Sequence, residues 1–346
     1  MLDDALLEIH ELSVGFRRGW RAQPVRALDG VSMCIPRGKT VGLVGESGSG
    51  KTTLGRAILG IAPITSGSVT FQGESITHTS IRRRRQLAPY IQVVFQDSNG
   101  SLSPRLSVGA SVAEPLRACK QLSPAKVRNE VDAVLERVGL PGSARRYPHE
   151  FSGGQRQRVA IARALVLRPR LVICDEVVSE LDLSVRAQVL NLLADLQREY
   201  GLSYLFIAHN LSVVHYLSDW IVVIYRGRVM ESGPATQIYN HPIHPYTRLL
   251  LSSEPAPLPV GDVRDNLRPV GRDAAKSTPR GGTDLGGSTT TVGGCPFATR
   301  CPVAIDICRS VRPNEAVTSD SRTVFCHLYN AVAPLIGSGD YAVNPG

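Results

Sequence analysis

Short apolar runs alternate with longer amphipathic stretches along the first two thirds of the chain. Residues 38 to 60 read as a buried strand, a glycine-rich turn and a helix, and further apolar runs at Leu171 to Cys174 and Tyr204 to Ala208 are bounded by polar or glycine residues. Such short, unbroken runs are typical of strands buried on both faces of a parallel sheet. The pattern therefore predicts an α/β fold with a mainly parallel sheet.

Two stretches carry apolar residues at helical spacing. Leu183 to Tyr200 ends before Gly201, which predicts a crossover helix between strands. Ser123 can cap another helix, which Gly139 ends. We expect this helix to belong to a helical insertion from about residue 97 to 165.

Composition narrows the class of protein. The chain has 346 residues, 42% hydrophobic and 20% charged, so it can bury one large core or two smaller ones. No apolar run approaches the roughly 18 residues that a membrane-spanning helix requires, and the N-terminus is acidic where a secretory signal would be basic. The net charge of +9 comes from scattered arginines, with one compact run at Arg82 to Arg85. We interpret this run as a solvated face, with lipid headgroups or a protein partner as alternatives, and expect no nucleic-acid partner.

Residues 45 to 52 match the phosphate-binding pattern G-x-x-x-x-G-K-[ST] without a departure. In such a loop the backbone N–H groups point at phosphates, Lys51 neutralises the β and γ oxygens, and the Thr52 hydroxyl can ligate Mg²⁺. The residues expected to hold ATP here are Gly45, Ser47, Gly48, Ser49, Gly50, Lys51, Thr52 and Thr53.

Two acids, Asp175 and Glu176, end the apolar run that begins at Leu171. This places both carboxylates at the carboxyl edge of the sheet, where ligands of open α/β sheets bind. We expect Asp175 to hold Mg²⁺ through water, and Glu176 to orient or deprotonate the water that attacks the γ-phosphate. Together with the phosphate loop, the acids predict ATP hydrolysis.

A second glycine pair opens another helix at Ser152, Gly153, Gly154 and Gln155. A Ser hydroxyl and free amides at a helix N-terminus make another anion site. This stretch resembles the signature motif of ATP-binding cassette (ABC) ATPases. The resemblance implies a P-loop ABC ATPase core, with helices on both faces of the sheet and a helical signature subdomain, followed by a small C-terminal extension.

Other pieces of the ABC pattern stand in the expected order. The resemblance pairs Gln96 with the Q-loop glutamine, a further Mg²⁺ ligand, residues 179–182 with the D-loop, and His209 with the switch histidine. Phe16 resembles the aromatic residue that stacks on adenine, and Trp20 is a competing platform for the base. The catalytic residues thereby implied are Glu176, His209, Gln96 and Lys51.

The chain also resembles the ATPase subunits of bacterial dipeptide, oligopeptide and nickel importers. These importers have two types of ATPase subunit, and the chain resembles the type labelled F more closely. The resemblance is carried by residues 151–155, 178–185 and 244–250. The chain departs from that pattern at three positions, Val177 in place of Pro, Glu180 in place of Ala and Asn210 in place of Asp. The hydrolytic residues are intact.

The resemblance divides the chain into an ABC ATPase domain, residues 1–240, and a peptide-importer extension, residues 241–346. Gly261 to Gly294, rich in Gly, Ser, Thr, Pro and Arg, reads as a flexible linker. A small cysteine-rich module at residues 295–326 follows it.

The seven cysteines are distributed unevenly. We interpret the dispersed Cys34, Cys119 and Cys174 as small buried hydrophobic residues. The other four fall within 32 residues, at Cys295, Cys301, Cys308 and Cys326. Because thiols stay reduced in the cytosol, a metal centre is favoured over disulfides. Paired C-x2-C steps, which are usual for structural zinc, are absent from this spacing.

Four thiolates suffice for a [4Fe–4S] cluster, although the spacing fits no standard ferredoxin run. The tail is similar to the cysteine-containing extension of the same importer subfamily, some members of which carry such a cluster. We therefore predict an iron–sulfur centre, with zinc or no metal as the alternatives.

The resemblance implies an ATPase subunit that energises uptake of peptides or a related small solute, and a soluble or regulatory ABC ATPase is the alternative. The signature of one copy is expected to face the nucleotide of a partner ATPase, preferably a different chain. Two membrane permease subunits and an extracytoplasmic solute-binding protein complete the expected assembly. We expect this chain at the cytoplasmic face of the membrane, bound peripherally.

Overall fold

The structure is a computed structural model that describes residues 4–16, 25–119, 122–254 and 293–329. An eight-stranded sheet in these residues has the order β11-β12-β10-β9-β3-β8-β7-β6. Five neighbouring strands are parallel: β6 (Ile91–Val94), β7 (Leu171–Asp175), β8 (Ser203–Ala208), β3 (Thr40–Val44) and β9 (Trp220–Tyr225). The antiparallel edge consists of β10 (Arg228–Pro234), β12 (Thr323–Val324) and β11 (Ala316–Val317).

The parallel strands are buried on both faces of this sheet. In β8, Tyr204 and Phe206 belong to one hydrophobic core and Leu205 and Ile207 to the other, and all four side chains are 0% exposed. Because successive residues of a strand point to opposite faces, a strand covered on both sides needs an unbroken apolar run. The α/β fold and the strands predicted from such runs are confirmed.

The sequence patterns do not predict a second, antiparallel sheet of order β2-β1-β4-β5. Its strands are β2 (Val25–Pro36), β1 (Ala5–Phe16), β4 (Ile64–Phe71) and β5 (Glu74–Ser75). Register shifts interrupt the pairing of β1 with both neighbours, so its inward positions do not keep a strict period of two. This sheet and α1 (Lys51–Ile58) enclose the core that contains Leu205.

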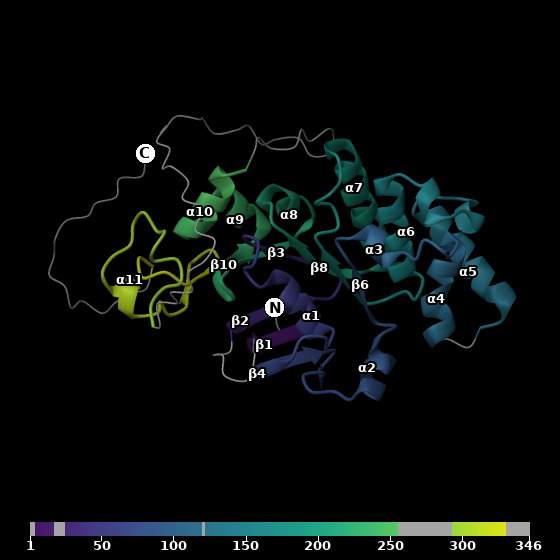
Figure 1. The fold of residues 1–346 in the computed structure, drawn as a ribbon. Coiled ribbons are helices and arrows are strands. Elements are labelled where there is room, and N and C mark those ends of the chain that lie inside the picture. Colours follow the sequence, from purple (N-terminus) through teal and green to yellow (C-terminus); the bar gives the residue numbers. More distant parts are fainter. Residues whose placement is uncertain (1–3, 17–24, 120–121, 255–292, 330–346) are drawn as a thin grey trace.

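A group of helices lies at the end of the molecule opposite the C-terminal module (Figure 1). These helices occupy the stretch from about residue 97 to 165, for which a helical insertion is predicted. They are α3 (Ser98–Ser101), α4 (Val108–Cys119), α5 (Pro124–Arg137), η1 (Ser143–Arg145), η2 (Pro148–Glu150) and α6 (Gly153–Leu165). The Ser123 hydroxyl accepts a hydrogen bond from the Lys126 N–H at 3.4 Å, which confirms the predicted cap of α5.

The crossover helix α7 (Leu183–Tyr200) is also confirmed, and Gly201 ends it in the left-handed conformation. It is followed by α8 (Leu211–Leu217), α9 (Ala235–Asn240) and α10 (Pro245–Ser252). Residues 293–329 form a small module with α11 (Ile307–Ser310), joined to the central sheet where β12 pairs with β10 (Figure 1). The predicted linker lies outside the described residues except for Gly293 and Gly294.

Two interpretations made from the sequence need correction. Of the dispersed cysteines only Cys174 is buried, because Cys34 lies half-buried in β2 and Cys119 is exposed at the end of α4. The arginine run lies in α2 (Ile81–Leu87) and is not solvated throughout. The Arg84 guanidinium donates to the carbonyls of Ile58, at 2.6 Å, and Ile76, so this arginine joins α2 to the core.

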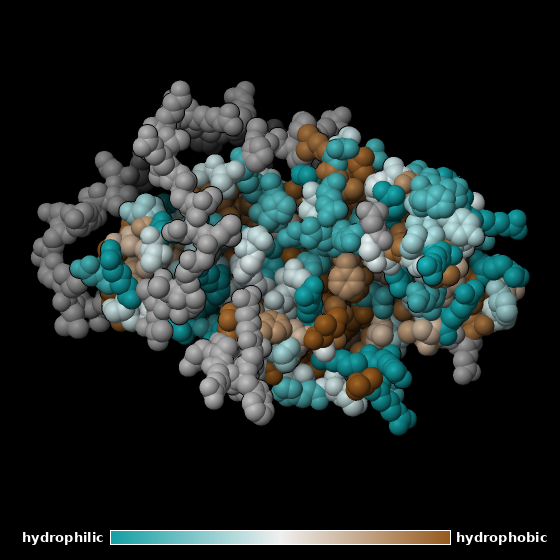
Figure 2. All heavy atoms as spheres, viewed as in Figure 1, coloured by the Kyte–Doolittle hydropathy of each residue, from teal (hydrophilic) through white to brown (hydrophobic). Residues whose placement is uncertain are grey.

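The surface seen in Figure 2 is largely hydrophilic, with hydrophobic residues gathered just above α2, near the middle of this face. Within the described ranges, no helix combines the length and the apolar character that crossing a membrane would need.

Candidate nucleotide-binding site

The phosphate loop connects β3 to α1 through two conformationally special positions. Gly48 (φ 77°) and Gly50 (φ 107°) adopt left-handed conformations, which glycine accepts without steric cost. They turn the backbone so that α1 begins at Lys51 with its first N–H groups free of helical partners. Ser47 and Gly48 lie exposed, while the Ser49 hydroxyl is buried without a hydrogen-bond partner in the part of the chain described.

The Lys51 ammonium lies inside this loop and is 4% exposed. It donates to the carbonyl oxygens of Gly45 and Glu46, at 2.8 and 2.9 Å, and its Nζ lies 3.9 Å from the nearer carboxylate oxygen of Glu176. Burial lowers the pKa of Lys51, against the attraction of the surrounding carboxylates. A buried cation held by two carbonyls is ready to exchange them for anionic oxygens.

Thr52 and Asp175 meet at the same edge of the sheet. The Thr52 hydroxyl donates to Asp175 Oδ1 at 3.1 Å, and burial raises the pKa of the Asp175 carboxyl. A hydroxyl and a carboxylate are oxygen donors of the kind that Mg²⁺ prefers. The pair therefore fits the predicted Mg²⁺ site in its chemistry. Thr53, the next residue of α1, is half-buried.

Glu176 and His209 lie beside this pair, at the ends of β7 and β8. Glu176 has a positive φ of 53°, and its N–H donates to the Ile207 carbonyl at 2.9 Å. Its carboxylate lies 4.0 Å from Nδ1 of His209. A cavity of about 20 Å³, lined in part by both residues, has room for one water molecule. Two parallel strands thus bring an acid, a histidine and space for a water to one place.

The predicted Q-loop and D-loop residues touch each other. Gln96 Nε2 donates to a carboxylate oxygen of Glu180 at 3.4 Å. The Ser179 hydroxyl donates to the Glu176 carbonyl at 2.8 Å, which ties the D-loop to the strand end. Glu180, a departure from the family's pattern, is thus the partner of Gln96 here.

The signature residues lie on another helix, α6, within the helical group (Figure 1). The Ser152 hydroxyl accepts from the Gln155 N–H at 3.4 Å, and the Gln155 side chain accepts from the Ser152 N–H at 3.0 Å. This capping box uses two groups that the sequence analysis leaves free for an anion. A Cβ atom at Gly154 would lie 2.3 Å from Cγ1 of Val185, so close packing against α7 requires glycine there.

Phe16, the predicted adenine platform, ends β1 opposite Val25 and is 41% exposed. An exposed ring at a sheet edge is available for stacking. Trp20, the competing platform, lies outside the described residues.

Sequence reasoning assigns no role to two side chains that contact the phosphate loop from the C-terminal region. The Tyr246 hydroxyl accepts a hydrogen bond from the Glu46 N–H at 2.9 Å, and Arg300 donates to both carboxylate oxygens of Glu46 at 2.8 Å. No local motif signals these contacts, because 200 and 254 residues separate the partners.

The four tail cysteines are near one another and form no disulfide. Burial raises the pKa of the Cys295 and Cys301 thiols and raises that of Cys326 to about 11, and neighbouring thiols in the tail add to each rise. Yet across the described ranges no three or more His, Cys, Asp or Glu side chains are arranged to hold a metal ion. The thiols fit a [4Fe–4S] cluster in number and chemistry, but their arrangement does not support one.

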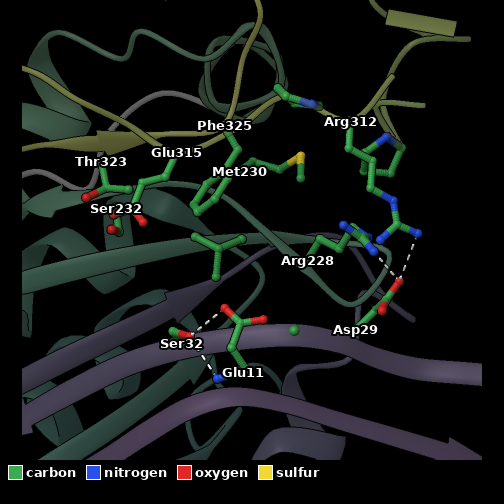
Figure 3. Close-up of a pocket in the computed structure, with 14 residues that line it drawn as sticks. Glu11, Asp29, Ser32, Arg228, Met230, Ser232, Arg312, Glu315, Thr323 and Phe325 are labelled. Atoms are coloured by element: carbon green, nitrogen blue, oxygen red, sulfur yellow. Dashed lines mark hydrogen bonds and ion pairs between the residues drawn. The ribbon is translucent and has the colours of Figure 1, made fainter. Parts of the chain in front are cut away.

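A further cavity, of about 190 Å³, lies between the antiparallel sheet, β10 and the tail module (Figure 3). Asp29, Arg228 and Arg312 meet at one side of it. The predicted nucleotide residues do not line this cavity.

Comparison with known proteins identifies the family to which the chain belongs. The sequence profile described as "ABC transporter" matches residues 28–179, and the one described as "Oligopeptide/dipeptide transporter, C-terminal region" matches residues 230–308. The chain is 45% identical to the di/tripeptide transport ATP-binding protein DppF of Pseudomonas aeruginosa, over 92% of this chain and 94% of that one. It is 44% identical to the oligopeptide transport ATP-binding protein OppF of Salmonella typhimurium, over 89% of this chain and 92% of that one.

Among solved structures, the chain is similar to the dimeric ATP-binding cassette MJ0796 in a post-hydrolysis state with ADP and phosphate, with a TM-score of 0.60 and 27% identity. That likeness covers 66% of this chain and 98% of the other. Sequence identity over nearly the whole chain, together with the phosphate loop and the two acids beside it, shows that the chain belongs to the ABC transporter family, as an ATP-hydrolysing subunit of the oligopeptide and dipeptide transporter branch.

Proposed function

We propose that this chain hydrolyses ATP to drive the import of dipeptides or oligopeptides. The observation that carries the proposal is the convergence of Lys51, the Thr52–Asp175 pair and the Glu176–His209 pair at one end of the parallel strands. The names of the relatives supply the peptide substrate and support an F-type subunit.

In this proposal the amides of Gly45 and of residues 47–50, together with the Lys51 ammonium, bind the phosphates of ATP. Lys51 leaves the carbonyls of Gly45 and Glu46 and turns to the β and γ oxygens, so its hydrogen bonds are exchanged and not lost. Thr52, Asp175 and Gln96 would hold Mg²⁺, which neutralises charge on the phosphates when it is bound. Phe16 stacks on the base.

Glu176 orients and deprotonates the attacking water, and His209 binds the γ-phosphate beside it. The backbone bond from Glu176 to Ile207 and the contact with Lys51 position the carboxylate. The His209 side chain is 57% exposed and lies 4.0 Å from the Glu176 carboxylate, so it is accessible to a nucleotide.

Residues 152–155 would act on the nucleotide of a partner ATPase. They begin α6, a different helix from the one that Lys51 begins, and the similar cassette MJ0796 is a dimer. The Ser152 hydroxyl accepts from the Gln155 N–H, so its own O–H stays available to donate to a phosphate of the partner's nucleotide. We propose a different chain as this partner.

ATP hydrolysis would drive conformational changes in two membrane permease subunits. A solute-binding protein would deliver the peptide to these subunits on the extracytoplasmic side. The hydrophobic surface just above α2 in Figure 2 supports docking of such a permease. The chain would then lie peripherally on the cytoplasmic face of the membrane.

The iron–sulfur cluster of the tail stays a prediction. The number and the chemistry of the four thiols support it, while no metal-holding arrangement is found in the described residues. A structural zinc ion bound by the same thiolates is the alternative.

The Glu176→Gln variant tests the hydrolytic assignment. Removing a general base lowers turnover by about 10²- to 10⁴-fold, while ATP binding should persist because Lys51 and the loop are unchanged. The measurement is ATP hydrolysis by the assembled transporter, with Glu199→Gln on the far end of α7 as the control variant. Wild-type turnover in Glu176→Gln would contradict the assignment, and turnover without peptide transport would favour a soluble or regulatory ATPase.

A further inference from the structure

Glu46, the second residue of the phosphate loop, is held from three directions. Its carbonyl accepts from Lys51 at 2.9 Å, its N–H donates to Tyr246, and its carboxylate accepts two bonds from Arg300. Tyr246 and Arg300 both belong to the C-terminal region that follows the ATPase core. The peptide group before Glu46 therefore cannot shift without breaking its bond to Tyr246, and the Glu46 side chain cannot move without breaking its contact with Arg300.

The tail module presents Arg300 to the loop on a fixed support. Phe297, 0% exposed, packs against Tyr225 and Tyr246, with ring centroids 5.4 and 5.3 Å apart, respectively. The Arg300 N–H donates to the Phe297 carbonyl at 3.0 Å, which closes a turn between Cys295 and Cys301. The Arg300 guanidinium lies 5.8 Å from the centroids of the Tyr225 and Phe297 rings, so stacking restricts its position.

The other end of the loop is tied to the same module. The Ser49 carbonyl accepts from the Gly227 N–H at 2.8 Å, and the Gly227 carbonyl accepts from the Asp29 N–H at 2.9 Å. Arg312 of the module lies 3.5 Å from the Asp29 carboxylate, which Arg228 also contacts (Figure 3). The module thus contacts the loop directly through Glu46 and, through Asp29, at Ser49.

We infer that Arg300 is a positioning residue of the phosphate loop, through which the cysteine-rich module sets the affinity of this chain for ATP. The inference rests on the proposed function, since it takes the loop to be the ATP site. In this inference Arg300 acts through Glu46 and not by binding the phosphates itself. It holds Glu46 so that the amides of the loop are ordered before ATP arrives, and a preorganised site binds more tightly because it loses less conformational freedom on binding.

The expected effect is moderate and specific. Arg300 and Glu46 are 43% and 38% exposed, so water replaces part of the lost ion pair in a variant. We expect Arg300→Gln to weaken ATP binding about three- to tenfold, which corresponds to the energy of a bidentate pair of this kind. The turnover at saturating ATP should change little, because neither residue contacts Glu176 in the described residues.

The test uses the full chain and trinitrophenyl-ATP as the fluorescent probe. Arg300→Gln, Glu46→Gln and the double variant are compared with Arg309→Gln, which removes an exposed arginine beside Cys308 in the same module. If Arg300 acts through Glu46, both single variants weaken binding to the same degree, the double variant weakens it no further, and Arg309→Gln binds normally. Arg300→Lys should restore part of the affinity.

Two results would overturn the inference. One is unchanged affinity in Glu46→Gln, which leaves the module intact even where Arg300→Gln disturbs its folding. The other is a double variant whose loss equals the product of the single losses, since a general effect of the module on stability is independent of Glu46. Probe binding by the Lys51→Ala variant distinguishes failure of this inference from failure of the proposed function. If the wild type binds the probe and Lys51→Ala does not, the ATP site stands whatever Arg300 does.

Discussion

The burial of Asp175 lowers the stability of the folded chain, and we expect its role as a Mg²⁺ ligand to require that burial. Asp175 is buried, and burial raises the pKa of its carboxyl above the ordinary value of 3.8. The ionised carboxylate needed for a Mg²⁺ ligand is therefore the form that the folded chain without nucleotide disfavours. Such sites are where a protein trades stability for activity.

Asp175→Asn should accordingly stabilise the nucleotide-free chain and abolish most ATP hydrolysis. The amide keeps an oxygen acceptor for Thr52 but carries no charge, so we expect a gain of about 0.5–2 kcal/mol in the free energy of unfolding near neutral pH. Because the native-state pKa is raised, the charge penalty is fully present above that pKa, declines as pH falls between the two pKa values, and is absent below the unfolded-state value. Urea unfolding between pH 3.5 and about 8 checks this; a gain that grows as pH falls would contradict it.

The packing of α6 against α7 positions the signature residues. The α6 N-terminus packs so closely on α7 that Gly154 has no room for a Cβ beside Val185. Val185 cannot easily turn away, since a β-branched side chain in a helix has one strongly preferred rotamer. The glycine is therefore explained by packing, independently of any role in binding an anion.

Gly154→Ala should destabilise the chain by about 1–3 kcal/mol, as overpacking typically does. Shortening the neighbour in the double variant Gly154→Ala/Val185→Ala should recover much of that loss. Thermal unfolding and hydrolysis by the assembled transporter are both measured. If stability returns in the double variant and hydrolysis does not, Gly154 also contributes its flexibility or its amide to function; no recovery of stability would contradict the packing explanation.

At the scale of the whole molecule, the C-terminal module is part of the ATPase and not an appendage. β12 extends the central sheet through β10, Arg322 lies 3.9 Å from the buried Glu231, and Arg300 reaches Glu46. A change at the cysteines can therefore reach the nucleotide site.

Metal analysis of anaerobically purified protein tests the predicted cluster at this scale. A [4Fe–4S] centre would give about four iron atoms and acid-labile sulfide per chain, with broad absorbance near roughly 400 nm. Cys301→Ser should remove both and weaken probe binding as Arg300→Gln does, since Arg300 is the preceding residue. One zinc per chain without iron would reject the cluster, and wild-type iron in Cys301→Ser would show that this cysteine is no ligand.

The sequence by itself determined the parallel strands, the helices that carry strong caps and the chemistry of the phosphate loop. Each of these follows from local physics: a strand covered on both faces needs an unbroken apolar run, and Gly48, Gly50 and Lys51 act within one turn of chain. Tertiary structure alone decided the antiparallel sheet, the use of Glu180 as the partner of Gln96, and the contact of Arg300 with Glu46. These depend on which residues distant in sequence are packed together, and the local pattern of hydrophobic and polar positions carries no record of that.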